Sequence, residues 1–177
     1  AYRSGGRDEA LAVSGQMGEE IGVWLIETYA PRATDEALLA YYSELYALTS
    51  GPLADHPDAC YGFFFPDQFE GSPPTPDLTD MGIDPMPMAR RMAELTNGAA
   101  DELVPYDASL IPEVQQLAGM ALIETMGAEN VDLLGERRPM GRADYALACD
   151  GMGAFFGAIL EAENGVVFLR ALASSEG

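Results

Sequence analysis

Residues 34–52 read TDEALLAYYSELYALTSGP, and this stretch carries the clearest structural signal in the chain. Thr34 is followed by two acidic residues, a pattern typical of the N-cap and first turn of a helix. Gly51-Pro52 ends the pattern, because a helix rarely continues through this pair. Between these limits the apolar side chains recur at steps of three and four, as on one helix face: Leu38, Tyr41, Tyr42, Leu45 and Leu48. The stretch therefore predicts a helix with one face in a core.

Similar patterns on both sides of this stretch predict further helices. No segment alternates between apolar and polar residues as a strand would, and no internal repeat is visible. We predict an all-α fold, a single-domain bundle of six or seven helices over residues 1–177, with residues 1–8 as a frayed start. The expected helices after the first stretch are a short one from Pro57, then 88–104, 107–126, a turn at 129–134, 142–161 and 166–173; another runs from Asp8 to Pro31.

The length and composition are those of a folded globular protein. The chain has 177 residues, of which 48% are hydrophobic, and its mean hydropathy is -0.01. This apolar content excludes disorder as the main state. The longest strongly apolar stretch without a charge is Gly151–Leu160, about half of the ~20 residues that a bilayer requires. We therefore expect no membrane-spanning segment.

Charge is the strongest feature of the composition. The chain has 29 acidic and 9 basic residues, all nine of them Arg, and its formal net charge is -20. Such a protein repels phosphate backbones and anionic membranes, so we expect no nucleic-acid partner. A cationic protein partner is favoured by the same field, although solubility or salt adaptation also produces an acidic surface. The absence of Lys excludes Schiff-base and Walker A chemistry.

The two cysteines, Cys60 and Cys149, do not form a CxxC motif and have only one histidine to accompany them, which disfavours a zinc site. They are either buried free thiols or one long-range disulfide. Each lies on a stretch expected to face the core, so we predict the disulfide. The printed sequence begins at Ala1 without Met, as a protein does after signal-peptide removal or after trimming. Both observations point to the periplasm or another extracytoplasmic compartment.

Residues 66–87 contain six of the twelve prolines and show no helical period, so we predict a long acidic loop. Such a loop is either functional or simply solvated. Calcium could bind several of its carboxylates, but the EF-hand pattern is absent and we expect no metal or other cofactor. We predict that its acidic residues bind the partner: Asp67, Glu70, Asp77, Asp80 and Asp84.

His56 is the only histidine, and Asp55 and Asp58 lie beside it in sequence. A histidine with a carboxylate neighbour is the usual general-base arrangement, so these three residues are weak catalytic candidates. No GxSxG motif supplies a nucleophile, and a lone loop histidine near a helix start needs no catalytic role.

Two hypotheses of different classes follow. The first is a non-catalytic extracytoplasmic helical domain that binds a cationic protein, as an inhibitor or immunity-type protein does. The alternative is a small hydrolase-like enzyme that uses His56 with nearby carboxylates. We favour binding, because the sequence contains no second histidine, no lysine and no recognised nucleophile motif.

Overall fold

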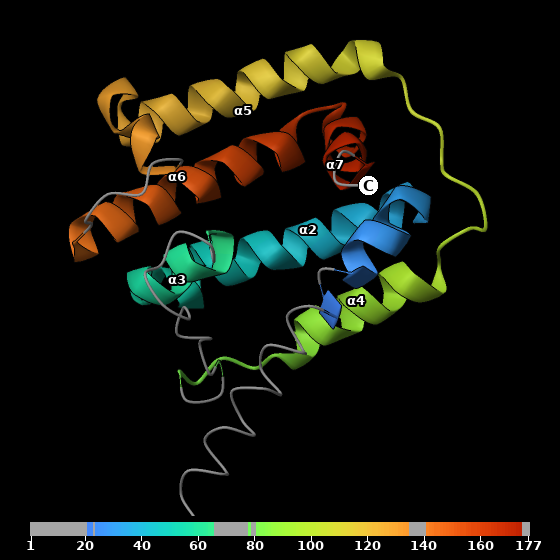
Figure 1. Cartoon of the computed structure of the whole chain (residues 1–177), viewed down its shortest axis with the longest axis horizontal. Helices are drawn as coiled ribbons and strands as arrows, with labels where there is room; N and C mark the ends of the chain where they lie inside the picture. Colours follow the sequence, from blue (N-terminus) through green and yellow to red (C-terminus); the bar gives the residue numbers. More distant parts are fainter. Residues whose placement is uncertain (1–20, 23, 66–77, 79–80, 135–140, 175–177) are drawn as a thin grey trace, which may run out of the picture.

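The computed structural model describes residues 21–22, 24–65, 78, 81–134 and 141–174 (Figure 1). Every regular element in these ranges is helical, which confirms the predicted all-α class. The α-helices and the short 3-10 helices, labelled η, are η1 (Ala30–Arg32), α2 (Asp35–Ser50), η2 (Pro52–Asp55), α3 (Pro57–Phe64), α4 (Met86–Asn97), η4 (Ala108–Leu110), α5 (Ile111–Met126), η5 (Ala128–Leu134), α6 (Arg142–Glu161) and α7 (Gly165–Ser174).

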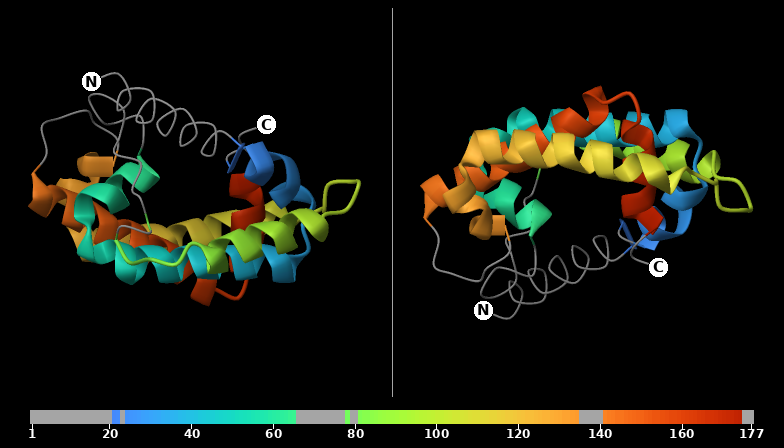
Figure 2. Two further views of the ribbon diagram at one scale, coloured as in Figure 1. Left: turned by 90° about the horizontal axis from the view of Figure 1, so that it is seen from below. Right: turned by 90° about the horizontal axis from the view of Figure 1, so that it is seen from above.

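Four of the helices lie side by side in the order α5, α6, α2, α4 (Figure 1). At one end α3 packs against α6. At the other end α7 runs across the ends of the row rather than along it, and it contacts η1, α2, α5 and α6 (Figure 2). Helix α6 is therefore central, with α5 on one side and α2 on the other.

Helix α2 forms as its sequence predicts. The Thr34 hydroxyl accepts a hydrogen bond from the backbone N–H of Ala37 at 3.2 Å. The predicted apolar residues are buried except Leu48, which is only partly buried, and Thr49 is buried in its place. The Thr49 hydroxyl can be buried because it donates to the Leu45 carbonyl oxygen at 2.9 Å.

The predicted limits of the helix over 88–104 are wrong. Helix α4 begins at Met86, two residues earlier, because the first turn of a helix lacks backbone acceptors and so tolerates Pro87. The helix ends at Asn97, before Gly98, well short of residue 104. Residues 86 and 87 of the predicted loop therefore belong to α4. Of the predicted 66–87 stretch, residues 66–77 and 79–80 lie outside the described residues, as do residues 1–8.

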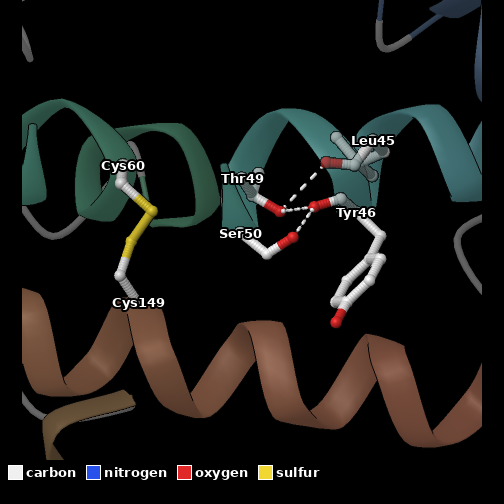
Figure 3. Close-up of a disulfide and its surroundings, with 6 residues drawn as sticks. All are labelled: Leu45, Tyr46, Thr49, Ser50, Cys60 and Cys149. Atoms are coloured by element: carbon white, nitrogen blue, oxygen red, sulfur yellow. Dashed lines mark hydrogen bonds between the residues drawn. A yellow bond between two sulfur atoms is a disulfide. The ribbon is translucent and has the colours of Figure 1, made fainter. Parts of the chain in front are cut away.

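Glycines allow α6 to approach both of its neighbours closely. A Cβ at Gly151 would collide with the Met126 side chain of α5. A Cβ at Gly157 would lie 3.3 Å from the ring of Tyr46, which points from α2 toward α6 in Figure 3. Small residues at these positions thus bring three helices into contact, despite a cost of about 1 kcal/mol each in helix propensity.

A disulfide joins Cys60 of α3 to Cys149 of α6, as predicted (Figure 3). The two Cα atoms are 6.1 Å apart, which is within the range that a disulfide spans. The bridge is buried in a small apolar cluster with Leu53, Ala59 and Ile83. It therefore connects two helices through cysteines 89 residues apart in sequence. Through its contact with Ile83 the cluster also supports the segment that precedes α4.

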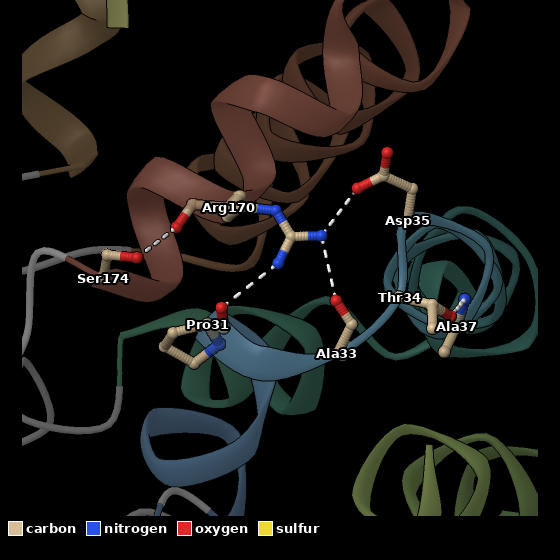
Figure 4. A network of polar contacts seen from close by, with 7 residues as sticks. All are labelled: Pro31, Ala33, Thr34, Asp35, Ala37, Arg170 and Ser174. Carbon is tan, nitrogen blue, oxygen red and sulfur yellow. Dashed lines mark hydrogen bonds and ion pairs between the residues drawn. The ribbon is translucent and has the colours of Figure 1, made fainter. Parts of the chain in front are cut away.

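Arg170 of α7 is a buried cation that the sequence analysis did not single out. Its side chain is 2% exposed. The guanidinium donates to the carbonyl oxygens of Pro31 at 3.2 Å and Ala33 at 3.0 Å, and it pairs with the Asp35 carboxylate at 2.6 Å (Figure 4). Arg170 thus fastens the last described helix to the start of α2.

Helix α6 is long and apolar enough, by length and composition alone, to cross a membrane. The uncharged run Gly151–Leu160 is only half of this helix, which also contains Asp144 and Asp150. The core helix of a soluble bundle meets the same criteria, and among the described elements α6 contacts the α-helices α2, α3, α5 and α7. The absence of a spanning segment accordingly stays a prediction.

Two buried tyrosines predict loss of stability at high pH. Tyr41 is 5% and Tyr61 2% exposed, and burial raises the pKa of both phenols above the usual value of about 10. Between the unfolded and folded pKa values the unfolded chain holds fewer protons, so the free energy of unfolding falls as the pH rises above about 10. We expect ultraviolet titration to show these phenols ionising together with the loss of the circular dichroism signal. Tyr41→Phe should reduce this dependence of stability on pH. An unchanged pH profile would show that the Tyr41 phenol does not cause it.

Candidate functional site

A pocket lies between the C-terminal half of α2, the start of η2 and the segment that leads into α4. Its volume is about 290 Å³, near the lower end for ligand pockets. This size suits a single side chain or a small ligand. Most of its lining is apolar, and two carboxylates complete it: Ala47, Leu48, Pro52, Leu78, Gly82, Ile83, Pro85, Pro87 and Met88, with Glu44 and Asp84.

The wall formed by residues 81–85 is held by local and tertiary contacts. The Ile83 N–H donates to the Leu78 carbonyl oxygen at 2.7 Å, which closes a turn. Gly82 has φ = 73°, a left-handed conformation that glycine adopts without strain. Ile83 is 7% exposed and packs in the cluster that contains the disulfide. The wall is thus fixed both by its own turn and by the bridge between α3 and α6.

The two carboxylates of the pocket differ in their partners. Oδ1 of Asp84 accepts the backbone N–H of Met86 at 3.0 Å, and in the described ranges no cation lies within ion-pair distance of Asp84. The Glu44 carboxylate lies 3.7 Å from Nε of Arg91, whose Nη1 is held more tightly by Glu94 at 2.7 Å. The charge of Asp84 is therefore available to a ligand, whereas Arg91 offsets part of the charge of Glu44.

An apolar wall beside carboxylates is suited to an arginine or lysine side chain. The methylene groups of such a side chain can cover apolar surface while its charged end remains with an anion. A charge-assisted hydrogen bond to a carboxylate is about twice as strong as a neutral one. The arrangement can bind a cation.

Of the five acidic residues predicted to bind a partner, Asp84 is placed by the structure in the pocket wall. Asp67, Glu70, Asp77 and Asp80 lie outside the described residues. Glu44 was missed, because a glutamate between apolar residues of a helix has the pattern of an ordinary solvated face. Only the packing of α2 beside α4 reveals its position.

The three catalytic candidates surround the junction between η2 and α3. His56 is partly buried, and its backbone carbonyl accepts the N–H of Cys60 at 2.9 Å. Asp55 and Asp58 are exposed, and the Asp55 carbonyl oxygen accepts from Arg142 at 3.3 Å. No hydrogen bond or ion pair of the His56 imidazole is found within the described part of the chain. The role that the structure shows for His56 is thus a backbone one, as the acceptor of the Cys60 N–H at the start of α3.

A metal centre is equally without support in the ranges that the structure describes, because they contain no group of three or more His, Cys, Asp or Glu residues placed to hold an ion. The pocket beside Asp84 is therefore the candidate site. Comparison with protein-family models, curated proteins and solved structures finds no match to this chain.

Proposed function

We propose that this chain is a non-catalytic, extracytoplasmic helical binding protein whose partner is a cationic protein. An inhibitor or immunity-type protein that neutralises a basic enzyme would have this character. The observation that carries the proposal is the pocket, where Asp84, which forms no ion pair with any described residue, lies beside apolar walls. A basic side chain of the partner would enter this pocket.

The overall charge supports the same proposal. A net charge of -20 attracts a basic protein over distances of about the Debye length, ~10 Å at moderate salt, and raises the rate of encounter. Charge alone gives little specificity, however, and a shaped pocket with a fixed carboxylate would supply it. Long-range attraction and local recognition would then act on the same partner.

The extracytoplasmic location is supported by the disulfide. Structural disulfides persist in oxidising compartments and are rare in the cytosol of mesophiles. The Cys60–Cys149 bridge is buried and supports the pocket wall through Ile83, so binding would depend on an oxidised protein. The periplasm is the compartment that we propose.

We expect Asp84→Asn to weaken binding of the partner by about tenfold or more, the value of a hydrogen bond to a charged group. The variant should also flatten the dependence of affinity on salt. The partner would be captured from the native source on the disulfide-bonded protein, and its dissociation constant measured by calorimetry at several salt concentrations.

The matched control is Asp101→Asn, which removes the same charge at an exposed position outside the pocket. Equal losses of affinity in the two variants would show that binding depends on net charge and not on the pocket. If His56→Ala abolished an activity of the protein while Asp84→Asn left it intact, the hydrolase alternative would replace the proposal.

A further inference from the structure

Helix α5 is apolar on two opposite sides. One side packs into the bundle through Val114 and Ala118, which are buried. The other side exposes three large apolar residues: Leu117 is 42%, Met120 45% and Ile123 47% exposed. A helix at the surface of a bundle ordinarily has a polar outer side, and one that is apolar all round is ordinarily covered. The outer side of α5 therefore has the composition of a contact surface.

The outer residues form one continuous helix face. Gln116, Gly119, Met120 and Ile123 are spaced at i, i+3, i+4 and i+7, the spacing of neighbours on a helix surface, and Leu117 adjoins them. We call these five residues the α5 face. Helix α5 lies at the edge of the row of helices, with α6 behind it, and it is nearest the viewer in the right panel of Figure 2.

Gly119 lies in this face and has no evident role in the packing of the bundle. A Cβ built on Gly119 meets no atom within 4 Å, whereas a Cβ on Gly151 or Gly157 meets a neighbouring helix. A glycine in the middle of a helix reduces its stability, and alanine at this position would fit without a clash. A glycine on an outer face would, however, allow a helix of another molecule to approach closely.

Within the described residues, the charged side chains on α5 and on η5 that follows it are all acidic. The charged residues of α5 are Glu113 and Glu124, both exposed, and Glu129 follows in η5. A second copy of this chain would bring together two molecules of net charge -20, and an anionic lipid surface would also be repelled. Apolar contact with an acidic border is complementary to a helix that has an apolar face and basic flanks.

We propose that the α5 face docks a basic amphipathic helix of a protein partner. The proposal rests on the proposed function in one respect, that the partner is cationic. It adds a second contact surface, separate from the pocket beside Asp84, and it specifies the secondary structure of the partner that binds there. Met120, at the middle of the face, is the expected centre of the contact.

The test uses a helical peptide with Leu on one face and Lys on the other, and a control peptide with Glu in place of every Lys. We expect the Lys peptide to bind the disulfide-bonded protein and the Glu peptide not to bind. Met120→Glu should weaken binding of the Lys peptide by about tenfold or more, although it makes the protein more acidic. Purely electrostatic attraction predicts the opposite change, so binding to Met120→Glu as tight as to the wild type would overturn the proposal.

Two further variants provide the controls. Leu103→Glu makes the same chemical change at another exposed apolar residue, 67% exposed and outside α5, and should leave the affinity for the peptide unchanged. Gly119→Ala should weaken binding while raising the midpoint of thermal unfolding, a combination that damage to the fold would not produce. Equal weakening by Leu103→Glu and Met120→Glu would contradict the proposal.

Other outcomes separate this proposal from the proposed function. A wild-type dimer in sedimentation that Met120→Glu dissociates would assign the α5 face to a second copy and overturn the proposal. Failure of the wild type to bind the Lys peptide at low salt would also overturn it. Neither result affects the proposed function, which is tested separately by the response of the native partner to Asp84→Asn.

Discussion

We expect the Cys60→Ala/Cys149→Ala variant to lose about 4–5 kcal/mol in the free energy of unfolding. The bridge closes a loop over a sequence separation of 89 residues, and loss of this constraint raises the entropy of the unfolded chain. A loss of this size is a large part of the ~5–15 kcal/mol that stabilises a typical domain. For a chain of this length it corresponds to a fall of roughly 10–20 °C in the midpoint of thermal unfolding. Urea titration followed by circular dichroism measures the free energy of unfolding, and a thermal scan of the same signal measures the midpoint.

The matched control separates the cross-link from the packing of the sulfur atoms. Wild-type protein, reduced while unfolded and then refolded with reductant, retains both sulfur atoms and loses only the bond. We expect it to be nearly as unstable as the double variant. Two free thiols in the denatured, unreduced protein would show that the bond does not form in solution.

The disulfide also illustrates what could be predicted from the sequence. Cys149 lies on a stretch with a helical period and Cys60 precedes an aromatic run, so the sequence predicts that both face the core and pair. The limits of α2 and α6 were predictable for the same reason. Thr34 caps α2, and the apolar pattern of α6 runs without interruption from Arg142 to Glu161. Local signals suffice where neighbours in sequence decide the structure.

The start of α4 could not be predicted from the composition of the segment alone. Six prolines in residues 66–87 indicated a loop, but a proline in the first turn of a helix replaces an N–H that has no acceptor there. Pro87 is in that position, and the Asp84 carboxylate accepts the Met86 N–H at the same turn. Whether a proline such as Pro87 belongs to a loop or to the first turn of a helix depends on which residue begins the helix. The packing of α4 in the fold decides this.

The candidate site was only partly predictable for a related reason. Asp84 was selected because it is acidic and lies in a proline-rich stretch. Its partner in the pocket, Glu44, comes from α2, and their proximity results from the packing of α2 beside α4. No pattern within either stretch indicates the other, because the pocket exists only in the assembled fold.

Arg170 is the clearest case of a residue that local patterns could not identify, since arginines are mostly exposed. We expect Arg170→Met to lower the free energy of unfolding by about 2–4 kcal/mol. Methionine fills much of the same space but donates no hydrogen bond, so the carbonyl oxygen of Ala33 loses its side-chain donor in a buried site. The carbonyl oxygen of Pro31 loses one of two donors and keeps the Val104 N–H at 3.1 Å. Asp35 is 64% exposed, so water solvates its carboxylate when Arg170 is replaced. Asp35→Asn should cost less, about 1 kcal/mol or below, because the guanidinium keeps both carbonyl acceptors and the amide oxygen of asparagine can still accept from it.

The matched control is Arg91→Met, the same substitution in an arginine that is 38% exposed and forms ion pairs with Glu44 and Glu94 at the surface. Exposed pairs contribute little, so this variant should unfold at nearly the wild-type urea concentration. Arg170→Lys should fall between the wild type and Arg170→Met, because one ammonium group cannot match the planar geometry that reaches three acceptors. Equal stability of the Arg170→Met and Arg91→Met variants would contradict the role of Arg170 as the tie between α7 and the start of α2. A large loss in Arg170→Met with a small one in Asp35→Asn would show that the two backbone carbonyls, rather than the ion pair, account for the stability of this contact.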